Sequence, residues 1–142
     1  MEILLIEDNA ADARLVQEAL ADGEVQAQLR WMASGEEALD YLRQTGEHAN
    51  ARTLPDLVLL DLNLPGLNGH EVLAAIKSDP ALLRVPVVVL TSSANPTDVQ
   101  AAYGMHANAY LIKPLDYADF LTLVGQIRSH WLSAVLLPSR AA

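Results

Sequence analysis

The sequence predicts an open α/β fold in which five parallel strands are covered by helices on both faces. Short apolar runs alternate with stretches of helical spacing, and 51% of the 142 residues are hydrophobic. The runs 57–60 and 87–90 are wholly apolar, which is typical of strands covered on both sides. Right-handed crossovers then favour a flavodoxin-like, doubly wound sheet with the strand order 2-1-3-4-5.

Five runs predict the strands, in chain order 2–6, 25–31, 57–60, 87–90 and 109–112. The first run is apolar after its opening glutamate, so it is expected inside the sheet. The second alternates apolar and polar residues, which indicates a half-buried strand at an edge. The remaining three are continuous apolar runs and are expected to be covered on both faces.

Helices are expected after these strands, at about 12–20, 35–44, 69–78, 97–103 and 117–132. The first has apolar residues at helical spacing and stops before Gly23. The second begins at Ser34, which has Glu37 three residues later, as in a capping box. The fourth begins at Asn95, an N-cap residue followed by a proline at the first helical position. A long polar loop is expected over 45–55.

Composition narrows the classes of partner and location. The formal charge of −9 argues against nucleic acid and against an anionic membrane surface, because both favour clustered Lys and Arg. With no cysteine there is no disulfide framework, and no apolar stretch approaches the ~18 residues of a bilayer span. We expect a cytoplasmic protein with one domain over 1–132 and a C-terminal tail over 133–142.

Polar residues follow four of the predicted strands: Glu7 and Asp8, Asp61, Thr91, and Lys113. In a doubly wound sheet the carboxyl ends of the strands line the ligand site, so these side chains should converge. Three crowded carboxylates repel unless a proton or a cation neutralises them. Oxygen ligands without His or Cys favour Mg²⁺, for which the backbone carbonyl of Asn63 is a further candidate ligand. Without that convergence, the acids would merely favour a helix start and the lysine would be solvated.

The same set predicts phosphorylation of an aspartate. Asp61 is the expected nucleophile, because a carboxylate forms an acyl phosphate when a metal neutralises the incoming charge. Lys113 would pair with Asp61 and then with the phosphoryl oxygens, and the Thr91 hydroxyl would bind one of them. Pro114, which follows Lys113, is a candidate for a cis peptide bond.

These residues closely resemble the receiver domain of bacterial two-component response regulators. The separations between Asp61, Thr91 and Lys113 fit, and Pro65, Gly66 and Gly69 lie at the family's offsets from the aspartate. The resemblance implies phosphotransfer from the histidine of a sensor kinase to Asp61, with Mg²⁺ held by Glu7, Asp8 and Asp61. It also implies that Thr91 and Tyr110, where receivers carry a switch aromatic residue, couple phosphorylation to the face of the fourth helix, fifth strand and fifth helix. The long loop and the segment 60–65 resemble the single-domain subgroup that pairs with bacterial phytochromes.

The predicted fifth helix has two apolar stripes. One stripe should face the sheet, and the other suggests an isologous homodimer built with the tail. The residues of this second stripe are Tyr117, Leu121, Leu132 and Leu136. The alternative is that the tail folds back on its own domain. Trp31 and Trp131 are expected to be core anchors, and the four histidines, which lack ligand spacing, to be surface or packing residues.

Two other classes of function are weighed against this interpretation. A Mg²⁺-dependent aspartyl phosphatase of the haloacid dehalogenase type also uses an aspartate nucleophile, but it has a second aspartate two residues later, where this chain has Asn63. A dimeric scaffold that works without phosphorylation would need none of the acceptor residues. No output domain is expected, so the product of the switch would be a change of shape or of a downstream partner that the sequence does not name.

Overall fold

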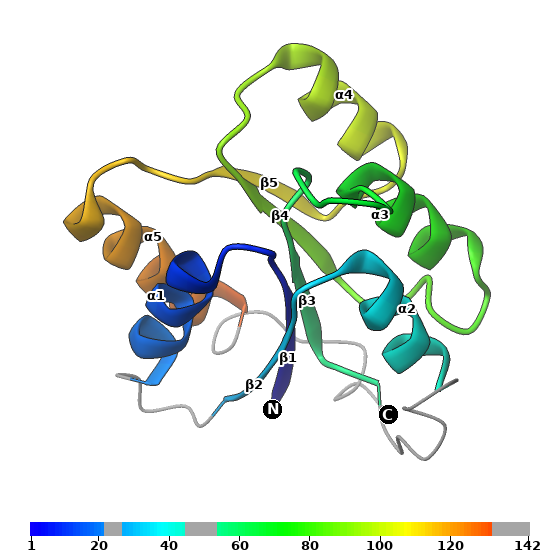
Figure 1. Ribbon diagram of the computed structural model, residues 1–142, viewed down its shortest axis with the longest axis horizontal. Coiled ribbons are helices and arrows are strands. Elements are labelled where there is room, and N and C mark those ends of the chain that lie inside the picture. The colour runs from blue at the N-terminus through cyan, green and yellow to red at the C-terminus, as the bar shows by residue number, and fades with distance from the viewer. Residues whose placement is uncertain (22–26, 45–53, 132–142) are drawn as a thin grey trace.

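The computed structural model describes residues 1–21, 27–44 and 54–131, and these form a single parallel sheet flanked by helices (Figure 1). The strands are β1 (Glu2–Ile6), β2 (Gln28–Met32), β3 (Leu57–Leu60), β4 (Val87–Thr91) and β5 (Ala109–Ile112). Their order in the sheet is β2-β1-β3-β4-β5, and all four pairings are parallel. The predicted fold class and strand order are therefore confirmed.

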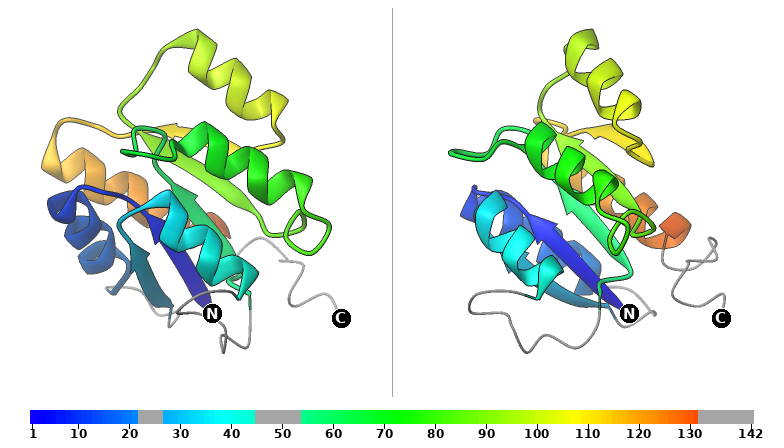
Figure 2. Two further views of the ribbon diagram at one scale, coloured as in Figure 1. Left: turned by 45° about the vertical axis from the view of Figure 1, so that its right-hand side comes forward. Right: turned by 90° about the vertical axis from the view of Figure 1, so that its right-hand side faces the viewer.

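Helices cover both faces of the sheet (Figure 2). They are α1 (Ala10–Ala21), α2 (Gly35–Arg43), α3 (Gly69–Ser78), α4 (Pro96–Gly104) and α5 (Tyr117–Ser129). The helices α1 and α5 pack on one face, and α2, α3 and α4 lie on the other. Within the described ranges, no helix has both the length and the apolar character needed to cross a bilayer.

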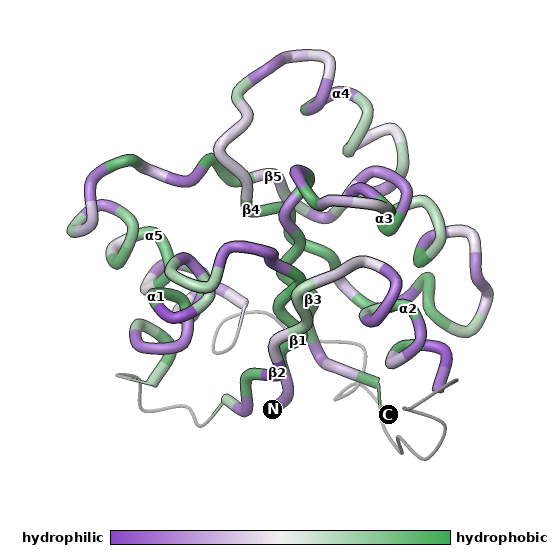
Figure 3. The backbone as a smooth tube through the Cα atoms, viewed as in Figure 1, coloured by the Kyte–Doolittle hydropathy of each residue, from purple (hydrophilic) through white to green (hydrophobic). Residues whose placement is uncertain are grey.

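The alternation of side chains along the strands divides the core into two layers. In β1, Ile3 and Leu5 pack against α1 and α5, whereas Leu4 and Ile6 pack towards α2 and α3. The central strands β3 and β4 are buried at every position, since both of their faces are covered. Figure 3 shows the resulting apolar centre and the more polar helices around it. Polar residues begin where these buried strands end, at the carboxyl edge of the sheet.

Local signals in the sequence set the helix starts. The Ser34 side chain accepts a hydrogen bond from the Glu37 N–H, as predicted, and Asn95 caps α4 ahead of Pro96. Asn68, a cap that the sequence analysis did not single out, forms a full capping box with Glu71 at the start of α3. These caps fix where each strand-to-helix loop ends, and the loops after β3 and β4 carry part of the polar edge.

One core prediction is wrong. Trp31 is 45% exposed, because it lies on the edge strand β2 with its ring outside the core. Trp131 is half-buried and packs against the α1 and α5 side of the core, as expected. The first residues of the predicted second strand, most of the 45–55 loop, and the tail from 132 onward lie outside the described residues.

Candidate functional site

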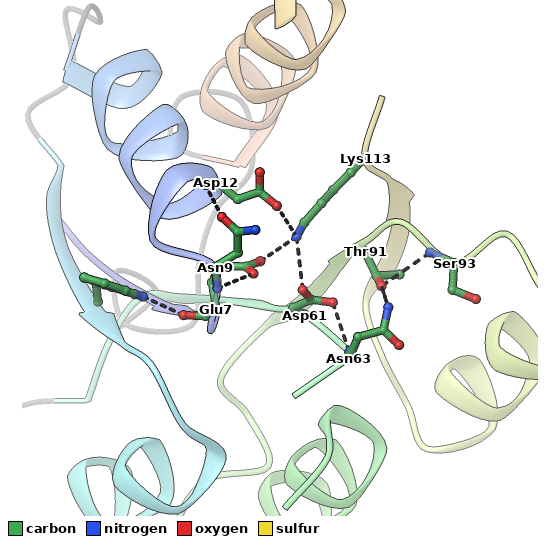
Figure 4. Close-up of polar contacts among 9 residues, drawn as sticks. Glu7, Asn9, Asp12, Asp61, Asn63, Thr91, Ser93 and Lys113 are labelled. Atoms are coloured by element: carbon green, nitrogen blue, oxygen red, sulfur yellow. Dashed lines mark hydrogen bonds and ion pairs between the residues drawn. The ribbon is translucent and has the colours of Figure 1, made fainter. Parts of the chain in front are cut away.

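The structure brings the predicted polar residues together at one edge of the sheet (Figure 4). The parallel ladder continues one residue beyond the strands: the Asp61 N–H donates to the Ile6 carbonyl at 3.0 Å, and the Lys113 N–H donates to the Thr91 carbonyl at 2.7 Å. Likewise, the Glu7 N–H donates to the Met32 carbonyl at 3.1 Å. Each functional side chain is thus attached to backbone that the sheet holds in place.

Burial separates this site from the rest of the polar surface. Glu7, Asp61 and Thr91 are the polar residues that are buried in the part of the chain the structure describes, with 2%, 5% and 0% exposure. Burying a carboxylate costs free energy unless it is paired or hydrogen-bonded. Two acids and a hydroxyl buried together at the end of a sheet therefore need specific partners.

Lys113 is the main partner of these acids. Its Nζ donates to Glu7 Oε2 at 2.6 Å, to Asp61 Oδ2 at 3.0 Å and to Asp12 Oδ2 at 3.0 Å. The side chain of Lys113 is only 8% exposed, so these ion pairs are screened little by solvent. The prediction that Lys113 pairs with the acids of this edge fits this geometry, whereas a solvated lysine does not.

The two buried acids respond differently to the crowding. Burial, together with the charge of Asp61, raises the pKa of Glu7 from 4.5 to about 7, against the opposing effect of Lys113. Burial acts on Asp61 in the same direction, but the Asn63 N–H, which donates to Asp61 Oδ1 at 3.1 Å, and the Lys113 ammonium together lower its pKa. Asp61 is therefore held ionised, and the cost of crowding falls on Glu7.

The acids fit a hard divalent cation. One carboxylate oxygen each from Glu7, Asp8 and Asp61 lies within 4.8 Å of the others, and no histidine or cysteine joins this cluster among the described residues. Oxygen-only ligands at an exposed rim suit Mg²⁺ or a similar ion, which keeps several of its waters. Asp8 is exposed and Glu7 is buried, so such an ion would lie between solvent and the buried end of the sheet.

Thr91 and Tyr110 are joined through Ser93 in the loop after β4. The Thr91 hydroxyl accepts long hydrogen bonds, both at 3.5 Å, from the Ser93 N–H and from the Asn63 side chain. The Tyr110 hydroxyl donates to the Ser93 carbonyl at 2.8 Å. The two predicted switch residues thus hold the same loop residue, although they lie on different strands.

This loop is also tied to α3. Ser93 Oγ donates to Asp98 Oδ2 at 2.6 Å, and the other oxygen of Asp98 lies 3.0 Å from His70 Nε2. The hydrogen bonds from Ser93 and His70 lower the pKa of Asp98. His70, expected to be a surface or packing residue, is therefore a partner that connects α3 with α4.

Glycine is required after β3. A Cβ at Gly69 would lie 2.4 Å from the carbonyl oxygen of Asp61 and 2.4 Å from the Cα of Leu62, both of which are backbone atoms. Gly66 has a φ of +68°, which favours glycine. The spacing of these glycines after Asp61 is thus explained by the close return of the loop to the end of its own strand.

Two residues of the site were missed and one prediction is wrong. Asp12, in the first turn of α1, binds Lys113, and the Trp31 indole N–H donates to the Glu7 carbonyl at 2.6 Å. Neither follows a strand in the way that the other residues do, so no pattern pointed to them. The predicted cis peptide bond before Pro114 is wrong: this bond is trans, as are the other peptide bonds of the described residues. The trans form is the ordinary preference of X–Pro bonds.

Of the predicted dimer residues, the structure describes two. Tyr117 is 56% exposed at the start of α5, whereas Leu121 is half-buried and packs against the core. Leu132 and Leu136 lie outside the described residues.

The sheet order and the lysine among buried acids are those of a receiver fold, and the chain belongs to the response regulator receiver domain family, which it matches over residues 3–125. It is 48% identical to the response regulator Rcp1 of Synechocystis over 96% of this chain and 92% of that protein. It is 45% identical to the probable methanogenesis regulatory protein FilR2 of Methanothrix harundinacea, over 92% of this chain and 83% of that one.

Solved structures give the same assignment. The phosphorylated cyanobacterial phytochrome response regulator RcpA superposes with a TM-score of 0.93 at 50% identity, covering 96% of this chain and 97% of that one. The Mn²⁺-bound form of Rcp1 also has a TM-score of 0.93, at 48% identity, covering 96% and 98%. A divalent cation is therefore known to bind a relative with nearly the same fold.

Proposed function

We propose that this protein is a two-component receiver that accepts a phosphoryl group from a sensor kinase histidine on Asp61. The observation that carries the proposal is the Lys113 ammonium, which lies 3.0 Å from Asp61 and 2.6 Å from Glu7 on a side chain that is only 8% exposed. A buried carboxylate held ionised beside a fixed ammonium is prepared to act as a nucleophile toward an anionic group.

The protein's own residues do most of the work in this proposal. The Asn63 N–H orients one Asp61 oxygen, and Lys113 holds the other and then pairs with the new phosphoryl oxygens. The phosphorus–nitrogen bond of the phosphohistidine breaks as the phosphorus–oxygen bond to Asp61 forms, and the imidazole leaves and takes up a proton. Mg²⁺ held by Glu7, Asp8, Asp61 and the Asn63 carbonyl would neutralise the charge that the incoming group brings.

The signal would leave through the loop after β4. Thr91 would bind a phosphoryl oxygen and so move toward Asp61. Because the Thr91 and Tyr110 hydroxyls both hydrogen-bond to the backbone of Ser93, this movement would reach Tyr110. The face formed by α4, β5 and α5 would then change its fit to a downstream protein. The protein would assist only its own phosphorylation and dephosphorylation, and not the turnover of other substrates.

Intact-protein mass spectrometry after incubation with acetyl phosphate tests the acceptor. We expect an adduct of one phosphoryl group that requires Mg²⁺, is lost in EDTA and is absent from Asp61→Asn. Asp56→Asn is the matched control, since it changes an acid at the opposite end of β3. An adduct that persists in Asp61→Asn would refute the assignment of the acceptor.

The two alternatives have less support. A phosphatase of the dehalogenase type needs a general acid two residues after the nucleophile, but here the Asn63 side chain donates to Thr91. A scaffold independent of phosphorylation does not account for the buried Asp61 and Lys113. Equal binding of a partner by wild type and Asp61→Asn would favour the scaffold.

The similarity to Rcp1 and RcpA supports a phytochrome-type kinase as the phosphoryl donor, and a cytoplasmic location follows from such a donor. Transfer of radiolabelled phosphate from a purified phytochrome-type kinase to wild type but not to Asp61→Asn tests this pairing. A kinase of another sensor class that transfers faster would contradict it.

A homodimer through α5 and the tail is a separate proposal. Tyr117, Ile112 and Leu115 are 56%, 48% and fully exposed, so this end of β5 and α5 presents apolar surface. Sedimentation of the full chain and of a chain truncated after Leu132 measures the contribution of the tail. Equal masses in solution would exclude the tail from the interface.

A further inference from the structure

Asp12 differs from the other acids that contact Lys113. Its carboxylate is 31% exposed, whereas those of Glu7 and Asp61 are 3% and 6% exposed. It is also outside the group of three acids whose oxygens lie close enough to share one cation. Asp12 therefore carries its charge at little cost from burial and has Lys113 as its ion-pair partner.

The start of α1 holds Asp12 in place. Its N–H donates to Asn9 Oδ1 at 3.1 Å, and the Asn9 N–H donates to Glu7 Oε1 at 3.1 Å. This chain of hydrogen bonds connects the first turn of α1, which carries Asp12, to the buried Glu7. Figure 4 shows both side chains directed at the end of Lys113.

A cation at the acid cluster would compete with Lys113. Glu7 and Asp61 are acids of the proposed metal site and also two of the three acids that Lys113 contacts. A divalent cation on these carboxylates repels the ammonium and takes over its electrostatic role. Of the three acids that contact Lys113 in the described ranges, Asp12 is the one outside the proposed cation site.

We infer that Asp12 is a positioning residue that keeps the Lys113 ammonium beside Asp61 when a divalent cation occupies the acid cluster. This inference rests on the proposed function, because it concerns the same phosphoacceptor site. Asp12 provides the ammonium with a partner at the rim, so the cation can bind without driving Lys113 away from the acceptor. Asp12 thereby weakens the competition of Lys113 with the cation for the carboxylates of Glu7 and Asp61.

A Mg²⁺ titration of folded Asp12→Asn tests the inference. The fluorescence of Trp31 provides the signal, because its indole donates to the Glu7 carbonyl. We expect the affinity for Mg²⁺ to fall about threefold to fivefold, the upper part of the range for an exposed ion pair. Asp12→Glu, which keeps the charge, should restore the affinity to within about twofold. Glu18→Gln is the matched control, since it removes an exposed acid from the same helix.

The same substitution in a Lys113→Met background separates positioning from a simple field effect. If Asp12 acts through Lys113, its removal should change the affinity much less when Lys113 is absent. Equal losses in both backgrounds, or a loss no larger than that of Glu18→Gln, would overturn the inference and leave the proposed function intact. Absence of Mg²⁺ binding by wild type would overturn the metal part of both.

Discussion

Replacing Lys113 with Met tests how far this lysine stabilises the acids around it. Methionine keeps most of the length of the side chain but removes the ammonium from Glu7, Asp61 and Asp12. Removing one partner of a buried ion pair costs about 3–5 kcal/mol, because the remaining charge stays buried. Two of the three acids are nearly inaccessible to water, so water cannot replace the lysine at either of them.

Protonation limits the size of this loss. The pKa of Glu7 is already about 7, so at about pH 7.5 protonation of Glu7 costs no more than about 1 kcal/mol. Its contribution to the loss of folding free energy cannot exceed that cost. Asp61 starts from a lowered pKa, so protonation relieves it far less readily than it relieves Glu7. The loss should therefore fall mainly on Asp61, and we expect a total of about 3 kcal/mol without metal.

Urea unfolding followed by circular dichroism, in EDTA and in excess Mg²⁺, measures this loss. The destabilisation should fall to about half in Mg²⁺, since the cation takes over the role of the ammonium. Lys77→Met is the matched control: Lys77 Nζ donates to the carbonyls of Leu83 and Val85 and to Asn108, so its loss should not depend on Mg²⁺. If Lys113→Met and Lys77→Met respond alike to Mg²⁺, the reasoning is refuted.

Three further predictions concern the same edge of the sheet. Gly69→Ala should destabilise the fold by about 2–3 kcal/mol and impair phosphorylation, because the new Cβ would clash with backbone atoms. Gly125→Ala, whose Cβ would have nothing within 4 Å, should be neutral or stabilising by up to about 1 kcal/mol. Urea unfolding of both variants compares the two effects. In EDTA, Glu7 should contribute a fall in unfolding free energy of up to about 3 kcal/mol as the pH rises from about 4.5 to 7, because its folded pKa is raised; an unchanged pH profile in Glu7→Gln would contradict this. Asp61→Asn in EDTA should change stability by less than about 1 kcal/mol, because loss of the Lys113 ion pair is offset by relief of Glu7, and a loss above about 2 kcal/mol would exclude this compensation.

The sequence predicts the central part of the site because topology does most of the positioning. Strand β3 and the first four residues of β4 are short, wholly apolar runs, so the ends of these runs are identifiable from the sequence. In a parallel sheet those ends share one edge, and Asp61 and Thr91 follow directly. No knowledge of side-chain packing is needed for this step, only the strand order.

Residues that join the site only through side-chain contacts with another element could not be predicted from the strand order. Asp12 contacts Lys113 from the first turn of α1, and in the sequence it looks like an ordinary first-turn acid. Trp31 is predicted to be a core anchor, but it lies on the edge strand β2 and its indole N–H donates to the Glu7 carbonyl. His70 pairs with Asp98 of a different helix, which no local spacing reveals.

The difference between the buried acids is visible only in the structure. The sequence predicts that the three carboxylates repel, but Asp61 accepts hydrogen bonds from a backbone N–H and an ammonium, whereas burial raises the pKa of Glu7. The asymmetry matters for function. A nucleophile must be ionised, and a neighbouring acid with a pKa of about 7 can be protonated without a cation and ionised with one. Occupation of the site by a divalent cation and release of a proton from Glu7 should therefore be linked, while Asp61 stays ionised in both states.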